Sequence, residues 1–203
     1  MLPEKYPDIK VYWSFEKNKI EEYKSAFSRL VVGQINAFGD ITVGVAIVEG
    51  IRRAIPIVID NGALLSQISA MLCGCGLITD DYFPIIIFDE KYYRRKEKKP
   101  TVLDSVYHEL GHLYLKHLAR NAKSKDENGK ERTERMENGE VFWQEKEADT
   151  FACHYIGKDA MIEHLIDLKK AAIELANKDK DLSFSLPYIQ TELKKRIEFI
   201  KEL

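Results

Sequence analysis

Cysteine is scarce in this sequence. The chain of 203 residues contains three cysteines, and this odd number does not make a disulfide framework. Cys73 and Cys75 are separated by a single residue, which disfavours a zinc knuckle, so we expect both to be small buried apolar side chains. This cysteine usage is consistent with a reducing, cytoplasmic environment.

Long apolar runs are lacking as well. The most apolar stretch, residues 41–59, is interrupted by Glu49, Arg52 and Arg53, so it cannot span a lipid bilayer. The first residues do not form a basic region followed by an apolar run, so we expect no secretory signal. The sequence therefore predicts a protein of the cytoplasm that does not bind a membrane.

Neither sign of charge is in large excess. The chain has 31 Lys and Arg residues against 33 Asp and Glu residues, and its formal net charge of −2 provides no overall attraction to nucleic acid. The hydrophobic fraction of 45% is sufficient for a substantial single core. We therefore expect residues 1–203 to form one domain of mixed α and β structure.

One short motif carries chemistry, because residues 108–112 read His-Glu-Leu-Gly-His. Two histidines four residues apart lie on the same face of a helix, one turn above the other. This spacing lets both imidazoles bind one metal ion, while Glu109 between them can accept a proton from an attacking water molecule. His108 and His112 are therefore candidate metal ligands, and Glu109 is a candidate catalytic base.

The sequence around this motif favours a helix. Thr101 is a suitable N-cap residue, and Asp104 follows three residues later. Apolar residues then recur at helical spacing and define a stripe that should face the core: Leu103, Val106, Leu110 and Leu113. On a helical wheel the two histidines point away from Leu103 and Leu110, as metal ligands should.

A second segment can complete the metal site. Residues 145–149 read Glu-Lys-Glu-Ala-Asp, and Glu145, Ala148 and Asp149 share one helical face. Glu145 can serve as a third ligand and leave a fourth position open for water or substrate. Asp149 can accept a hydrogen bond from a ligand imidazole, and the small Ala148 lets two helices approach closely. Two histidines and a glutamate are the ligand set of a hydrolytic zinc enzyme.

The combination of His-Glu-x-x-His with a downstream Glu-x-x-Ala-Asp resembles the gluzincin class of zinc metallopeptidases. The resemblance implies that one zinc ion is bound by three residues: His108, His112 and Glu145. It implies that Glu109 is the catalytic acid/base and that Asp149 is the hydrogen-bond partner of a ligand histidine. It also implies a zincin-like α+β fold, with a small twisted sheet, an edge strand over the active-site helix and a helical C-terminal half.

Two families within this class fit the sequence. Residues 107–117 and 145–152 look like the ImmA/IrrE family, which consists of soluble bacterial and phage peptidases that cleave helix-turn-helix repressors. Residues 157–160 and 187–197 are similar in order to the HtpX and CAAX-protease family. The first resemblance implies a regulatory protease that acts on a protein such as a repressor, without direct nucleic-acid binding. The second implies a housekeeping or phage-borne peptidase.

The pattern divides the expected domain into two portions. Residues 1–99 should contain helix and sheet, and residues 100–203 should be helical and carry the metal site. The elements expected before the motif are helices at 16–31 and 63–72, a β-hairpin of 41–49 and 52–60, and a strand at 84–89. The zincin resemblance implies that 84–89 is the edge strand, to which an extended peptide can pair; an ordinary buried strand is the alternative.

Two polar segments and two helices complete the expected organisation. Residues 89–99 form a basic connector, and residues 122–140, which are almost free of apolar side chains, form a flexible loop. Apolar residues at helical spacing predict helices at 159–178 and 187–202. Both helices should pack against the core, and for the second one the alternative is that its apolar face covers a partner.

The donor that would stabilise a tetrahedral oxyanion is not identified by any motif. Three residues are candidates, each with a structural role as its alternative: Tyr155, His154 and Arg196. His117 and His164 lack ligand spacing and should lie on exposed or packing faces. A non-catalytic zinc-binding interaction protein is the rival class, although such a protein gains nothing from a carboxylate at Glu109. We therefore expect a zinc-dependent endopeptidase that hydrolyses peptide bonds.

Overall fold

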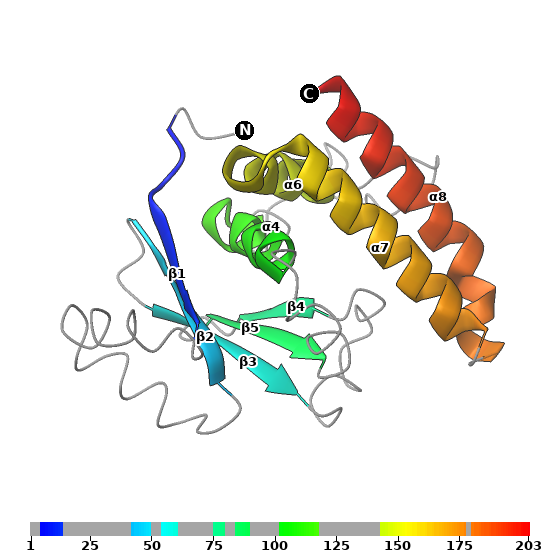
Figure 1. The fold of residues 1–203 in the computed structure, drawn as a ribbon, viewed down its shortest axis with the longest axis horizontal. Coiled ribbons are helices and arrows are strands. Elements are labelled where there is room, and N and C mark those ends of the chain that lie inside the picture. The colour runs from blue at the N-terminus through cyan, green and yellow to red at the C-terminus, as the bar shows by residue number, and fades with distance from the viewer. Residues whose placement is uncertain are drawn as a thin grey trace, which may run out of the picture. The chain divides into compact units, whose positions relative to one another are not determined.

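The computed structural model describes residues 5–13, 42–49, 54–60, 75–79, 84–89, 102–117, 143–177 and 180–203. These residues form a mixed α+β structure (Figure 1), which confirms the predicted class. The strands are β1 (Ile9–Trp13), β2 (Thr42–Val48), β3 (Ala54–Asp60), β4 (Cys75–Thr79) and β5 (Pro84–Asp89). The helices are α4 (Val102–Tyr114), α6 (Trp143–Ile156), α7 (Lys158–Ala176) and α8 (Lys180–Glu202).

The chain divides into two compact units, and the boundary in the sequence lies between Lys98 and Lys99. The strands belong to one unit and the helices to the other. The sequence pattern predicts a change from sheet to helix between residues 99 and 100, within a single domain. Both motifs that carry the candidate metal ligands lie in the helical unit.

The strands form one sheet in the order β1-β2-β3-β5-β4 (Figure 1). β1 pairs antiparallel with β2, and β2 pairs antiparallel with β3, which confirms the hairpin predicted from residues 41–49 and 52–60. β3 and β5 are parallel, and β4 pairs antiparallel with β5. The strand predicted at 84–89 is confirmed with the same bounds.

The expected position of residues 84–89 at the edge of the sheet is wrong. β5 lies between β3 and β4, and their ladders occupy both of its sides. Ile86, Ile87 and Phe88 are at most 1% exposed, and such a run of consecutive buried residues is typical of an interior strand. The backbone of β5 is therefore already paired, and the alternative of an ordinary buried strand is correct.

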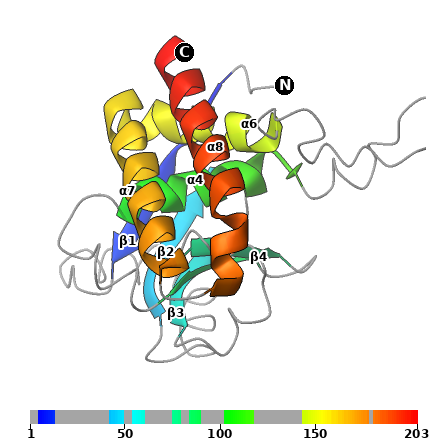
Figure 2. The ribbon, with the colours of Figure 1, turned by 90° about the vertical axis from the view of Figure 1, so that its right-hand side faces the viewer.

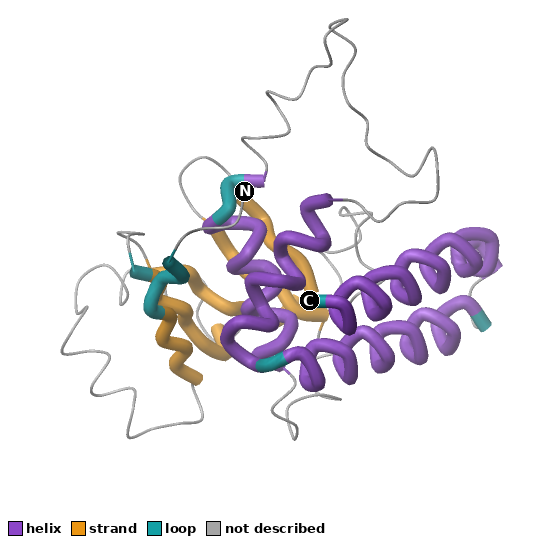
Figure 3. The backbone as a smooth tube through the Cα atoms, turned by 90° about the horizontal axis from the view of Figure 1, so that it is seen from above, coloured by secondary structure: helices purple, strands orange, loops and turns teal. Residues whose placement is uncertain are grey.

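In the helical unit, α4 packs against α6, and α7 and α8 form an antiparallel pair (Figures 1 and 2). Seen from above, the pair lies side by side (Figure 3). Apolar side chains from all four helices are buried: Val106, Leu110, Phe151, Met161, Leu165, Leu193 and Ile200. Their helical spacing explains why these segments fold as helices. None of the described helices is long and apolar enough to cross a lipid bilayer.

The closing helices differ in how well the sequence predicts them. α7 confirms the helix expected at 159–178, with ends that differ by one and two residues. The helix expected at 187–202 instead begins at Lys180, and Pro187 lies inside it. A proline removes one backbone hydrogen bond from a helix. Pro187 is exposed, however, and packing along α7 holds α8 as one helix, so this proline does not mark its start.

Several predictions fall outside the described residues: the helices at 16–31 and 63–72, the connector at 89–99 beyond Asp89, the loop at 122–140, and the burial of Cys73. Cys75 is the first residue of β4, but the burial of its side chain is likewise outside the description. Two described strands, β1 and β4, have no counterpart among the expected elements. β1 is short and partly exposed, and β4 contains a glycine and a cysteine, so neither has the Val- and Ile-rich pattern of β2 and β3.

Candidate metal centre

α4 presents the two histidines of the motif on one face. The helix starts at Val102, immediately after the predicted N-cap residue Thr101. His108 and His112 are one turn apart, with their Nε2 atoms 3.0 Å apart and their ring centroids 4.7 Å apart. Glu109 lies between them in sequence and is half-buried. The predicted spacing thus brings both imidazoles to one point.

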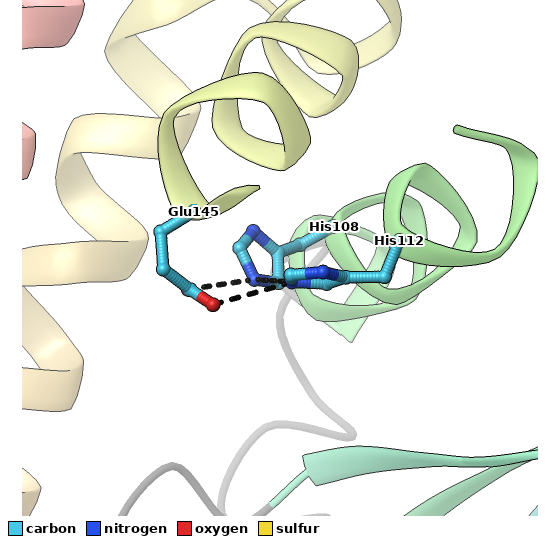
Figure 4. A group of neighbouring side chains, drawn as sticks. All are labelled: His108, His112 and Glu145. Carbon is cyan, nitrogen blue, oxygen red and sulfur yellow. Dashed lines mark hydrogen bonds and ion pairs between the residues drawn. The ribbon is translucent and has the colours of Figure 1, made fainter. Parts of the chain in front are cut away.

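Glu145 comes from the first turn of α6, and its carboxylate is directed at the histidine pair (Figure 4). Its Oε2 atom is 3.3 Å from Nε2 of His108, and its Oε1 atom is 3.4 Å from Nε2 of His112. One ligand atom of each residue lies within 4.8 Å of the others. In a tetrahedral zinc site with bonds of about 2.1 Å, neighbouring ligand atoms are about 3.4 Å apart. The distances between the three side chains are close to this spacing, so together they could hold one metal ion.

The two helices approach each other closely at Gly111. A Cβ atom at this position would be 3.1 Å from Cα of Ala148 and 3.2 Å from Cβ of Phe151. These neighbours are part of the helix backbone or attached directly to it, so they could move only if α6 moved. The small residues Gly111 and Ala148 therefore allow Glu145 to reach the histidines, as the sequence predicts for Ala148.

Asp149 and Arg196 form a buried ion pair behind the ligands. Nδ1 of His108 donates a hydrogen bond to Oδ1 of Asp149 at 2.9 Å, as the sequence predicts. Arg196 on α8 donates to both oxygens of Asp149, at 2.8 Å from Nε and 2.6 Å from Nη2. Its Nη1 atom is also 2.9 Å from Oε2 of Glu145. Asp149 and Arg196 are 0% and 4% exposed, so this arginine orients a fully buried aspartate and the half-buried Glu145.

Burial and charge act in opposite directions on the two carboxylates. Burial raises the pKa of Glu145, but the charge of Arg196 and a hydrogen bond with His108 outweigh it and hold the pKa well below its usual range. The same competition between burial and these two partners lowers the pKa of Asp149. Both carboxylates are therefore ionised near neutral pH, which is the form in which Glu145 can bind a metal.

The two histidines differ in their affinity for a proton. Burial lowers the pKa of His108, but hydrogen bonds with Asp149 and Glu145 outweigh it and raise the pKa to about 10. Burial lowers the pKa of His112 to about 3, and the charge of Glu145 opposes this only in part. His112 therefore presents a neutral imidazole, whereas His108 must release a proton before it can bind a metal.

A third histidine, His117, joins the centre although its spacing predicts an exposed or packing face. α4 ends at Tyr114, and Lys116 has a left-handed backbone with a φ of 56°. After this turn, Nδ1 of His117 is 2.8 Å from Nδ1 of His112, and Nε2 of His117 is 3.1 Å from Oε2 of Glu147. A spacing of five residues does not follow the helical face, so no periodic pattern could have found this contact.

The other candidate residues are not part of the ligand group. The ring of Tyr155 stacks on Tyr107 with centroids 4.8 Å apart, and the neighbouring His154 is exposed. These two follow Glu145 on α6 by nine or ten residues, which is roughly 14 Å along the helix axis. His164 is buried on α7. Of the oxyanion candidates, the structure thus places Arg196 at the ligand group, and Tyr155 and His154 farther along α6.

The chain was compared with protein-family models, curated proteins and solved structures, and none of the three comparisons found a match. The interpretation of the centre therefore depends on its own residues. Their donor set, their spacing and the ionised state of Glu145 suit a divalent metal, once His108 has released its proton.

Proposed function

We propose that this chain is a zinc-dependent endopeptidase of the gluzincin class. The observation that carries the proposal is the convergence of His108, His112 and Glu145 from two helices, with Glu109 between the histidines in the sequence. Two histidines and one glutamate leave a coordination position open, as catalytic zinc sites do. Structural zinc sites usually have four protein ligands, so this donor set favours catalysis.

Glu109 is the residue that moves protons in the proposed reaction. A bound zinc ion polarises the scissile carbonyl and lowers the pKa of water. As the water oxygen attacks the carbonyl carbon, Glu109 accepts the proton of the water. Glu109 then donates this proton to the leaving amine as the C–N bond breaks, and such general acid–base catalysis contributes about 10²–10⁴-fold to a rate. Asp149 keeps His108 oriented through the bond to Nδ1.

A zincin-like fold is part of the proposal. The resemblance to gluzincins implies one helix with His-Glu-x-x-His and a second, downstream helix with the glutamate ligand. α4 and α6 match this order, and a mixed sheet precedes them in sequence. The sheet contributes no residue to the ligand group, so the zincin comparison depends on the two helices.

The proposed substrate class follows from the resemblance to the ImmA/IrrE family. Residues 107–117 and 145–152 carry that resemblance and include all three ligands. We accordingly propose a regulatory protease of the cytoplasm that cleaves a protein such as a helix-turn-helix repressor. A repressor encoded beside this chain should be cut on incubation with the zinc-loaded protein. If it stays intact, the repressor assignment is wrong and the peptidase assignment is unaffected.

A housekeeping or phage-borne peptidase similar to HtpX and CAAX proteases is the second candidate. Its support is the order of residues 157–160 and 187–197 after the metal-binding motifs. Arg196 lies in the second of these segments and contacts both Glu145 and Asp149, which ties that segment to the centre. A peptidase of this type should cut many unfolded peptides, whereas a regulatory protease should cut few.

The test of the peptidase proposal compares the parent protein with Glu109→Gln. Glu163→Gln is the matched control, because Glu163 is an exposed glutamate on α7. Each protein is loaded with zinc, its metal content is measured by elemental analysis, and it is incubated with a peptide library prepared from a bacterial proteome. New N-termini are then counted by mass spectrometry.

We expect equal zinc content in all three proteins, cleavage by the parent and the control, and a loss of cleavage of at least about 100-fold in Glu109→Gln. Zinc binding without any cleavage by the parent would contradict the peptidase proposal. That result would favour the rival class, a non-catalytic zinc-binding interaction protein.

A further inference from the structure

The start of α6 does more than supply a candidate metal ligand, because three of its first five residues hold His117. Nε2 of Gln144 donates to the carbonyl oxygen of His117 at 3.3 Å. The ring of Trp143 meets the imidazole edge to face, with centroids 5.3 Å apart. Glu147 accepts a hydrogen bond from Nε2 of His117 at 3.1 Å. His117 is only 2% exposed, so the backbone, the ring and one ring nitrogen are all fixed by α6.

The other ring nitrogen of His117 points at a metal ligand. Nδ1 of His117 is 2.8 Å from Nδ1 of His112. On the opposite side of its ring, His112 directs Nε2 at the ligand group, 3.4 Å from Oε1 of Glu145. His112 is therefore held between the metal position and His117.

One assignment of protons satisfies every bond in this row. If His112 binds the metal through Nε2, its proton is on Nδ1, where it donates to His117. Nδ1 of His117 can accept this bond only if His117 carries its own proton on Nε2. That proton faces Glu147, and an ionised carboxylate is an acceptor and not a donor. Glu147 thus selects the tautomer of His117, and His117 selects the tautomer of His112.

The two ligand histidines are supported in different ways. Nδ1 of His108 donates directly to the carboxylate of Asp149. Nδ1 of His112 reaches the carboxylate of Glu147 through the intervening ring of His117. In metal sites, a partner that accepts the second ring proton fixes the orientation and tautomer of a ligand histidine. The ring of His117 therefore serves His112 as Asp149 serves His108.

We propose that His117 and Glu147 are positioning residues that hold His112 in the tautomer required for metal binding. The inference rests on the metal site of the proposed function. It adds two residues to the centre that do not touch the metal.

The test uses two substitutions of His117 and one of Glu147. His117→Leu removes both ring nitrogens, while His117→Asn keeps an oxygen near the place of Nδ1 that can accept the bond from His112. Glu147→Gln removes the charge at a side chain that is 18% exposed, so it disturbs packing little. Glu163→Gln again serves as the control.

Two properties are measured on each variant. The first is the dissociation constant for zinc, obtained by competition with a chelator of known affinity. The second is the tautomer of His112, read from the side-chain ¹H–¹⁵N NMR spectrum before zinc is added. The tautomer is a readout that a purely structural role of His117 would leave unchanged.

We expect His117→Leu to weaken zinc binding by about 10- to 100-fold and Glu147→Gln by about 10-fold, the range seen when such partners are removed. His112 should carry its proton on Nδ1 in the parent and lose this preference in His117→Leu. His117→Asn should bind zinc more tightly than His117→Leu. If His117→Leu does not fold, the zinc affinity of Glu147→Gln decides the outcome.

Parent-like zinc affinity and an unchanged tautomer in the folded variants would overturn the inference and leave the proposed function standing. A parent protein that does not bind zinc at all would instead overturn the proposed function. The two failures are therefore distinguishable in one series of measurements.

Discussion

At the scale of single residues, the centre balances charge in a buried place. Glu145 and Asp149 contribute two carboxylates, and Arg196 contacts both of them. Protonated His108 adds a second positive charge next to the same pair. Buried charges are tolerated when they are paired and hydrogen-bonded. The polar interior of the helical unit is therefore compensated before any metal binds.

The raised pKa of His108 leads to a prediction about pH. A proton and a metal ion compete for this imidazole. Because the pKa of His108 is about 10 and not the ordinary 6.5, the proton stays bound at neutral and mildly alkaline pH. The apparent zinc affinity should therefore rise between pH 7 and pH 9, by up to about tenfold per unit. Chelator competition at each pH measures it. An affinity that is flat above pH 7 would contradict the assignment.

The raised pKa of His108 also makes the stability of the folded protein depend on pH. A histidine with a raised folded-state pKa stabilises the folded protein fully below its unfolded value near 6.5. This contribution decreases as the pH rises from there towards about 10. Without added metal, the free energy of unfolding should therefore lose the His108 contribution over this alkaline range. Addition of zinc at high pH should restore stability, because the metal then takes the place of the proton.

Sequence alone predicts those residues of the centre that follow helical periodicity. His108 and His112 are four residues apart, as are Glu145 and Asp149, and the structure brings the two pairs together. The contact of His117 depends on a left-handed turn after α4, which no spacing reveals. The sequence suggests Arg196 only as an oxyanion donor. Its contacts with Glu145 and Asp149 depend on how α8 packs against α6, which no local pattern specifies.

At the scale of elements, two left-handed residues shape the ends of the helices that carry the site. Lys116 follows α4 with a φ of 56°, and Gly157 separates α6 from α7 with a φ of 86°. Residues other than glycine lose about 1–2 kcal/mol in this conformation. The backbone of Lys116 is therefore strained in the turn that brings His117 to the centre, whereas Gly157 adopts its turn without strain.

Substitutions at these two turns should change stability in opposite directions. Lys116→Gly should raise the free energy of unfolding by about 1 kcal/mol, because Lys116 is exposed and its strain is removed. Gly157→Ala should lower it by about 1 kcal/mol, since an added Cβ meets nothing within 4 Å and only the backbone is strained. Urea denaturation followed by circular dichroism measures both changes.

The control for this pair is Lys116→Ala, which removes the same side chain and keeps the Cβ atom. It should leave the free energy of unfolding close to that of the parent. An equal gain in Lys116→Ala and Lys116→Gly would show that the lysine side chain, and not the backbone conformation, is the cause.

Elements with a clear pattern are predictable, and those defined by their neighbours are not. The Val- and Ile-rich β2, β3 and β5 and the periodic α7 fall where the sequence places them. β1 and β4 are short and depend on pairing with strands far away in sequence. The interior position of β5 likewise follows from the parallel pairing with β3, which a local pattern does not specify.

At the scale of the whole molecule, all three proposed ligands lie in the unit that contains the helices. We therefore expect metal binding to stabilise that unit selectively. Zinc at about 100 times its dissociation constant contributes about 2.7 kcal/mol. Amide hydrogen exchange should slow in α4, α6 and α8 on addition of zinc and remain unchanged in the strands, and removal of zinc with a chelator should reverse the effect. Equal slowing in helices and strands would contradict this expectation.

The ion pairs of Arg196 join the last helix to a site whose ligands all come before it. Asp149 and Arg196 are 47 residues apart in sequence. A fragment ending ahead of α8 would retain both signature motifs and yet leave two adjoining anions without the arginine that contacts both of them. A search for motifs would count that fragment as competent, but repulsion between two carboxylates one turn apart on α6 would destabilise the turn that presents Glu145. The ability of this centre to hold its acidic residues in place thus depends on Arg196, near the end of the chain, as much as on the two motifs.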